Sequence, residues 1–149
     1  MIYHHVAITG AACAIGSAIA RAMRAAWPSC ELALIDRDAA PLDALAVKLG
    51  GPTEVHVADL RDLEALPALV DNIGALDGLV NCAGVMKVRQ VSTWQWSDAH
   101  DLMKIDLLAP LRLQDLICRG MVEQRRGVIV NIASMAGRVP LRGGAYYGA

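Results

Sequence analysis

The sequence predicts a doubly wound α/β domain, in which a parallel sheet of strand order 3-2-1-4-5 carries helices on both faces. Two observations predict this class. Short apolar runs rich in Val, Ile, Leu and Ala alternate with stretches of helical periodicity. Small or polar residues follow these runs, at the ends that a parallel sheet brings to one edge. We therefore expect a single domain over residues 1–149 that binds a ligand along that edge.

The apolar runs are expected to form five strands. Each has too few residues for a helix, and the apolar composition is typical of strands buried on both faces. Strand–helix alternation favours right-handed crossovers, which distribute the helices over both faces of the sheet. The runs are Val6–Thr9, Leu32–Ile35, Val55–Val57, Leu79–Val80 and Val128–Ile132.

The first two helices have clear boundary signals. Ile15–Trp27 is rich in alanine and ends directly before Pro28, which cannot continue a helix. Asp38 stands where an N-cap would begin a second helix, and this helix would reach about Leu49, before the glycines that start at Gly50.

The later helices are predicted from periodicity. Leucines at every third position indicate one helix over Leu60–Ile73. A long helix is expected to begin at Ser97 or Asp98 and to reach about Glu123, with a kink at Pro110.

Composition excludes several classes of protein. The 14 Lys and Arg balance 15 Asp and Glu, which argues against a nucleic-acid groove or an acidic-membrane surface. A hydrophobic content of 55% excludes disorder, yet no apolar stretch reaches the roughly 18 residues of a membrane span. We expect a cytoplasmic protein without a secretion signal or metal site. Its four cysteines show no zinc spacing and are interpreted as scattered, reduced thiols: Cys13, Cys30, Cys82 and Cys118.

The segment Thr9–Gly16 has the form of a phosphate-binding turn. It follows a predicted strand and precedes a predicted helix, as that motif requires. Gly10 can adopt the backbone angles of a tight turn, and Gly16 lets the helix start close to the sheet. The free N–H groups and the dipole of that helix would then face a pyrophosphate.

Asp36 ends the second strand, 20 residues beyond Gly16. A carboxylate at this place can accept hydrogen bonds from both ribose hydroxyls and would repel a 2′-phosphate, which favours NAD. Arg37 leaves NADP open, because its guanidinium could pair with that phosphate. A simpler interpretation is that Asp36 is a carboxylate leading into the next helix.

Four landmarks at this edge resemble the short-chain dehydrogenase/reductase family. They are the Thr9–Gly16 turn, Asp59 after the third strand, the Asn81–Gly84 tetrapeptide, and Ser134 followed thirteen residues later by Tyr147. The resemblance covers the whole chain and implies a Rossmann-like fold. It also implies an NAD(P)-dependent oxidoreductase that interconverts a secondary alcohol and a carbonyl compound.

The resemblance assigns roles to individual residues. Ser134 would hydrogen-bond the substrate oxygen, and Tyr147 would exchange a proton with it. Asp36 would hold the adenosine ribose, while Asp59 and Leu60 would contact the adenine. The remaining implied coenzyme contacts are Gly10, Ala14, Ile15 and Gly16 around the pyrophosphate and Asn81, Ala83 and Gly84 near the coenzyme's centre.

The chain departs from the family pattern at three places. Ala14 replaces the middle glycine of the turn, where its methyl could push the pyrophosphate away. Asp106 replaces an asparagine that the family uses to hold a water in a proton relay. As a catalytic residue Asp106 could hold the same water through its oxygens, but its charge would oppose deprotonation of the tyrosine. The family's lysine would fall two residues beyond Ala149.

The position of that lysine suggests that the sequence is a fragment or an interrupted reading frame. We expect the isolated chain to be poorly soluble or partly molten, with the fifth strand as a bare edge. The alternative to an enzyme is a non-catalytic dinucleotide-binding module or an inactive fragment. The full-length protein is expected to form a homo-oligomer and to act on a small alcohol or carbonyl substrate.

Overall fold

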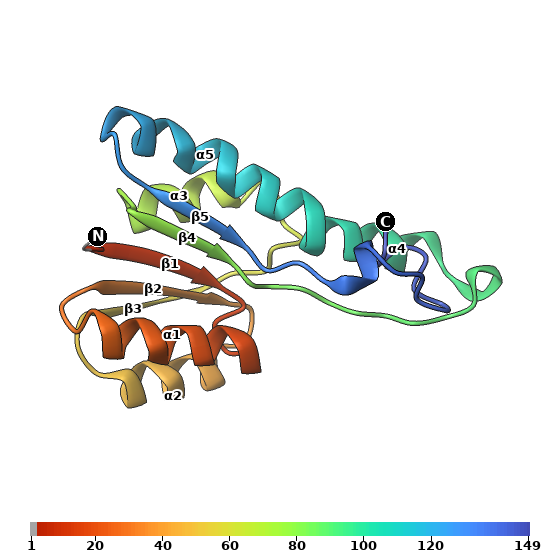
Figure 1. Cartoon of the computed structure of the whole chain (residues 1–149), viewed down its shortest axis with the longest axis horizontal. Helices are drawn as coiled ribbons and strands as arrows, with labels where there is room; N and C mark the ends of the chain where they lie inside the picture. The colour runs from red at the N-terminus through yellow and green to blue at the C-terminus, as the bar shows by residue number, and fades with distance from the viewer. Residues whose placement is uncertain (1–2) are drawn as a thin grey trace.

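The structure is a computed structural model that describes residues 3–149. Five parallel strands form one sheet in the order β3-β2-β1-β4-β5, as predicted. Helices α1 and α2 cover one face, and α3 and α5 cover the other (Figure 1). The strands are β1 (His5–Thr9), β2 (Glu31–Asp36), β3 (Thr53–Val57), β4 (Gly78–Asn81) and β5 (Val128–Asn131).

The first two helices lie close to their predicted positions. Helix α1 spans Ala14–Ala26 and α2 spans Ala39–Leu49. Asp38 is the residue at the N-cap of α2, but its side chain makes no capping hydrogen bond and instead lies 3.5 Å from the Nε of Arg37. The predicted boundary is therefore confirmed, whereas capping by the Asp38 side chain is not what begins the helix.

Helix α3 is shorter than the leucine repeat predicts, because it spans only Leu66–Ile73. The residues before it form tight turns, in which the carbonyl of Asp59 accepts the N–H of Asp62 at 3.0 Å. Leu60 is nevertheless buried, so at this position the leucine pattern correctly indicated a buried side chain but not a helix. Pro67, at the start of α3, suits a first helical turn, where its missing N–H leaves no hydrogen bond unmade.

The long helix forms, and a π-helical turn lies directly before Ala109 and Pro110. Helix α4 (Trp96–Met103) continues through a π-helical turn (Lys104–Leu108) into α5 (Ala109–Glu123). Pro110 has no N–H to donate to the carbonyl four residues earlier. The wider π turn before it accommodates the proline without that hydrogen bond. The turn presents Asp106 toward the sheet edge.

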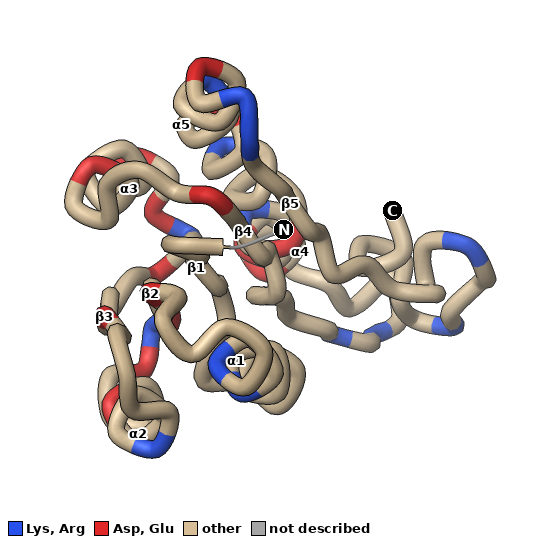
Figure 2. The backbone as a smooth tube through the Cα atoms, turned by 60° about the vertical axis from the view of Figure 1, so that its left-hand side comes forward, with Lys and Arg blue, Asp and Glu red and all other residues tan. Residues whose placement is uncertain are grey.

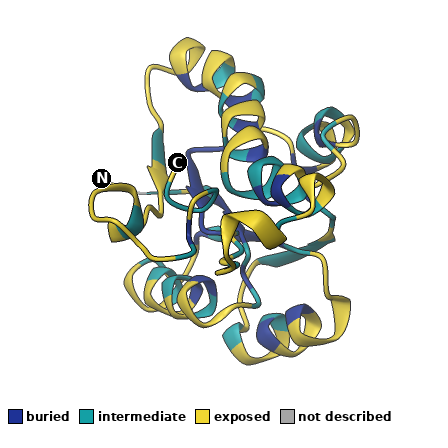
Figure 3. Cartoon of the chain, turned by 90° about the vertical axis from the view of Figure 1, so that its right-hand side faces the viewer, coloured by how far each residue is buried: buried dark blue, intermediate teal, exposed yellow. Residues whose placement is uncertain are grey.

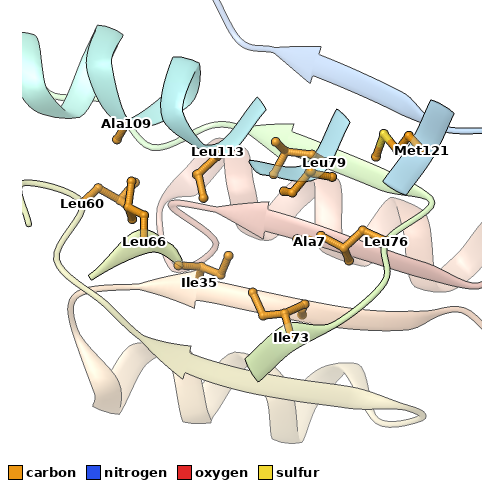
Figure 4. Packing of buried hydrophobic residues seen from close by; sticks show 12 residues of the cluster. Ala7, Ile35, Leu60, Leu66, Ile73, Leu76, Leu79, Ala109, Leu113 and Met121 are labelled. Carbon is orange, nitrogen blue, oxygen red and sulfur yellow. The ribbon is translucent and has the colours of Figure 1, made fainter. Parts of the chain in front are cut away.

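The core consists of two apolar layers, one on each face of the sheet. One layer packs β1, β2 and β4 against α3 and α5, as Figure 4 shows for Leu79 facing Leu113. The other packs the same strands against α1 and α2. Burial follows this layering, because the helices turn their buried stripes toward the sheet (Figure 3).

Charges are distributed over many elements of the chain. Figure 2 shows Lys and Arg on several helices and loops, interspersed with Asp and Glu. Within residues 3–149, no helix is long and apolar enough to cross a membrane.

Candidate functional site

A pocket of about 280 Å³ opens at the carboxyl edge of the sheet. The turn after β1, the ends of β2 and β3, and the segment after β4 all contribute to its wall. The fold thus brings together residues that lie far apart in the sequence. Of the predicted coenzyme contacts, those that line it are Gly10, Asp36, Arg37, Asp59, Leu60, Ala83 and Gly84.

The phosphate turn packs directly on the segment that follows β4. Gly10 has a φ of +64°, which favours glycine, and a Cβ at this position would lie 2.6 Å from the Cα of Ala83. A Cβ on Gly16 would overlap the carbonyl oxygen of Gly10 and lie 2.9 Å from the Cα of Ala11. Gly10 therefore has the tight-turn backbone angles that the sequence predicted, and both glycines are required by close backbone approach.

Two of the three N–H groups at the start of α1 are free among the described residues. The third, that of Gly16, donates to the Sγ of Cys13 at 3.3 Å. The N–H groups of Ala14 and Ile15 have no acceptor within residues 3–149. Ala14 does not have a positive φ, so its methyl group causes no backbone strain. Free donors at a helix N-terminus are the chemistry that holds a diphosphate, and these residues fit one.

Asp36 is oriented by two backbone hydrogen bonds. Its Oδ2 accepts the N–H of Ala12 at 3.0 Å, and its Oδ1 accepts the N–H of Arg37 at 2.8 Å. The carboxylate therefore ties the phosphate turn to the end of β2. The Arg37 side chain is engaged with Asp38, as described above.

Asp59 is held by an ion pair that sequence reasoning missed. Its carboxylate accepts hydrogen bonds from the guanidinium of Arg61, and Arg61 also reaches Asp101 of α4 at 3.4 Å. The hydrogen bond from Arg61 lowers the pKa of Asp59 to about 2. An arginine two residues after an aspartate is the only sequence signal of this pair.

Thr9 organises the segment after β4. Its buried hydroxyl oxygen accepts the N–H groups of Cys82 and Ala83, both at 3.1 Å. Asn81 donates its Nδ2 to the Oδ1 of Asn131 at 2.8 Å, which links β4 to β5 beside the site. The roles of Thr9 and Asn131 follow from strand register and had no local sequence signal.

Asp106 fastens the π turn of the long helix to the same segment. Its Oδ1 accepts the N–H of Val85 at 2.8 Å, and its buried Oδ2 has no hydrogen-bond partner in the part of the chain that is described. Burial raises the pKa of this carboxyl group. A neutral carboxyl offers one acceptor and one donor, as the amide of asparagine does.

Ser134 and Tyr147 lie outside this pocket. Ser134 is exposed, and its Oγ accepts the N–H of Ala136 at 3.2 Å. Tyr147 is half-buried. The chain folds back so that a Cβ on Gly148 would lie 2.8 Å from the carbonyl oxygen of Ala136. The backbones of the two segments are therefore adjacent, although no hydrogen bond joins the two side chains among residues 3–149.

Two cysteines meet at the phosphate turn. The Sγ of Cys13 lies 4.0 Å from the Sγ of Cys82. All four cysteines are free, and the sheet brings two that lie far apart in the sequence together, because it places the turn after β1 next to the end of β4.

Comparisons with known proteins agree with this arrangement. A family model described as short chain dehydrogenase matches residues 4–149. D-threitol dehydrogenase of Mycolicibacterium smegmatis is 33% identical over 141 residues, which are 90% of this chain and 54% of that protein. Galactitol 2-dehydrogenase (L-tagatose-forming) of Cereibacter sphaeroides is 33% identical over 137 residues, covering 89% of this chain and 53% of that protein.

A solved structure of a metagenomic short-chain oxidoreductase in complex with NADP is also similar. It has a TM-score of 0.90 at 32% identity and covers 97% of this chain and 68% of its own. The present chain spans about half the length of the curated relatives it matches.

Proposed function

The chain belongs to the short-chain dehydrogenase family, and we propose that it is a nicotinamide-dependent oxidoreductase that interconverts a secondary alcohol and a carbonyl compound. One observation carries the proposal. The phosphate turn, Asp36 and Asp59 all border one pocket at the carboxyl edge of the sheet, where α/β domains bind nucleotides. A cytoplasmic location and a homo-oligomeric full-length protein are part of the same proposal.

The adenosine half of the coenzyme would occupy the pocket. The free N–H groups at the start of α1 would hold the diphosphate, and Asp36 would hold the adenosine ribose. Asp59 and Leu60 would border the adenine, while Asn81, Ala83 and Gly84 would lie near the coenzyme's centre. The bound coenzyme would supply a hydride acceptor or donor.

The preference for NAD over NADP is proposed from the surroundings of Asp36. Its carboxylate borders the pocket and would repel a 2′-phosphate. The Arg37 guanidinium, which could attract that phosphate, already lies beside the carboxylate of Asp38.

Ser134 and Tyr147 would carry the proton chemistry. In the oxidation direction, the Tyr147 phenol oxygen would take the hydroxyl proton of the substrate while Ser134 Oγ holds the reacting oxygen. The adjacency of the Ser134 and Tyr147 segments supports this assignment. Asp106 would position the segment after β4 through its bond to Val85.

An NADH and NADPH titration of the Asp36→Ala variant tests the proposal. Loss of a charged hydrogen-bond acceptor should weaken NADH binding about tenfold or more and should improve NADPH binding relative to NADH. Asp43→Ala, an exposed carboxylate of α2, is the matched control and should leave both affinities unchanged. The ratio of the two affinities separates a changed site from a loosened fold, and an unchanged ratio in Asp36→Ala would refute the role of Asp36.

A non-catalytic dinucleotide-binding module is the second candidate. It is favoured by one observation, namely that Ser134 and Tyr147 do not line the pocket. The module would bind NADH and fail to oxidise it with any of a panel of ketones, ketose sugars and β-ketoacyl thioesters. Turnover that disappears in Tyr147→Phe, with NADH affinity retained, would establish the enzyme instead.

A further inference from the structure

Cys13 and Cys82 form a dithiol at the rim of the proposed coenzyme pocket. Their sulfurs lie 4.0 Å apart although the residues are 69 positions apart in the chain. Cys13 is exposed and lines the pocket, whereas Cys82 is 8% exposed and directly precedes Ala83, which also lines it. One sulfur therefore faces solution, and the second lies directly behind it.

The two thiols can reach bonding distance with a small movement. A disulfide requires about 2.05 Å between the sulfurs, so they must approach by about 2 Å. Cys13 is the N-cap residue of α1, and its Sγ accepts the hydrogen bond from the Gly16 N–H at 3.3 Å. Rotation about the Cα–Cβ bond of Cys13 toward Cys82 would break that hydrogen bond.

The surroundings assign different roles to the two sulfurs. Because Cys82 is buried, its sulfur is shielded from dissolved oxidants. Cys13 is the sulfur that a dissolved oxidant can reach first. A resolving thiol next to an accessible one is the arrangement that favours a disulfide over further oxidation.

We propose that Cys13 and Cys82 are a modification site, at which a peroxide-class oxidant forms an intramolecular disulfide that opposes coenzyme binding. In the first step the Cys13 sulfur attacks a peroxide oxygen, the O–O bond breaks, and a sulfenic acid and one water form. In the second step the Cys82 sulfur displaces the hydroxyl of that sulfenic acid as a second water. Two thiols lose two electrons in total, and the peroxide gains them.

The effect of the disulfide on coenzyme binding rests on the proposed function, and on the position of the dithiol at the rim of the same pocket. The disulfide would cross-link the phosphate turn to the end of β4, and both segments border the pocket that the coenzyme would occupy. Bound coenzyme would in turn cover Cys13. Because coupling between two sites is reciprocal at equilibrium, a disulfide that weakens coenzyme binding implies that bound coenzyme disfavours the disulfide by the same free energy.

Peptide mapping of the full 149-residue chain tests the disulfide itself. Trypsin places the four cysteines in four different peptides, residues 1–21, 25–37, 62–87 and 113–119. After hydrogen peroxide treatment, non-reducing mass spectrometry should find 1–21 joined to 62–87 within a monomer. Cys13→Ser and Cys82→Ser should each abolish this species, and Cys118→Ser, an exposed cysteine on α5, should leave it unchanged. Cross-links only between chains, or Cys13 oxidised without Cys82, would overturn the proposal.

NADH titration of the oxidised and the dithiothreitol-reduced chain tests the coupling. Oxidation should lower NADH affinity about tenfold, reduction should restore it, and Cys82→Ser should remove the dependence on oxidation. Equal affinities in the two states would overturn the coupling. A disulfide that forms in a chain that binds NADH in neither state would refute the proposed function and leave the modification site in place.

Discussion

The two ends of the polar sheet edge differ in how their residues are held. Around β1 and β2 the strands are buried, and Asp36, Thr9 and the glycines of the turn are fixed by backbone contacts on several sides. Around β5 the sheet edge is open. Val130 is 42% exposed, and Met135, next to Ser134, is 66% exposed.

This difference separates stability from proposed chemistry. Substitutions around β1 and β2 remove contacts that also hold the fold, so they should change the free energy of unfolding. Substitutions around Ser134 remove few contacts within the chain and should act on turnover alone. The predictions below test that contrast, in order of decreasing effect.

Gly16→Ala against Gly137→Ala is the sharpest test. A Cβ on Gly16 overlaps the Gly10 carbonyl oxygen, which is rigid backbone, whereas a Cβ on Gly137 meets nothing within 4 Å. We expect about 3 kcal/mol of destabilisation for Gly16→Ala and less than about 0.5 kcal/mol for Gly137→Ala. Urea unfolding monitored by circular dichroism measures both, and equal effects would erase the contrast.

Thr9→Val against Ser134→Ala compares the two ends through hydrogen bonds. Thr9→Val keeps the shape of the side chain but leaves the buried N–H groups of Cys82 and Ala83 without their acceptor. It should cost about 2 kcal/mol, while Ser134→Ala loses one exposed bond and should stay within about 0.5 kcal/mol. A Thr9→Val protein as stable as the parent would mean that water replaces the hydroxyl.

Asp106→Asn is expected to stabilise the chain at neutral pH. Burial raises the pKa of Asp106 in the folded state, so folding favours the protonated carboxyl and stability falls as pH rises from the unfolded pKa through the folded one. Asparagine keeps the acceptor for Val85 and cannot become charged. The urea midpoint should rise at pH 7 and change little near pH 3. A urea midpoint at pH 7 that is lower in Asp106→Asn than in the parent would show that the Asp106 charge stabilises the fold.

Asp59→Asn should give the smallest effect and the opposite pH dependence. Because Arg61 lowers the pKa of Asp59 from 3.8 to about 2, the stabilisation is present above pH 3.8 and is lost as pH falls toward 2. The Asp59 side chain is 38% exposed, so solvent screening limits its contribution to less than about 1 kcal/mol. Unfolding of parent and variant at pH 5 and pH 2.5 measures this difference. If the variant lost as much stability between the two pH values as the parent does, the pH dependence would belong to another carboxyl group.

Much of the fold could be predicted because its signals are local. The five strands and helices α1 and α2 appear where apolar runs, Pro28 and Gly50 place them. The start of α3 could not be predicted in this way. Leu60 fits the helical spacing of the leucines that follow it and is buried, yet the segment that begins at Asp59 forms tight turns and not a helix. At Pro110 the proline was visible, but the π turn that accommodates it depends on the packing of the whole helix.

The sequence by itself determined the class of fold, the order of the elements and the motif residues at the sheet edge. These depend on periodicity and on residues close together in the chain. Only the tertiary structure decided which side chains meet. Thr9 with Cys82 and Ala83, Asn81 with Asn131, Arg61 with Asp101, and Cys13 with Cys82 are joined across strands or between a loop and a distant helix, so their contacts follow from sheet register and helix packing rather than from any spacing in the sequence.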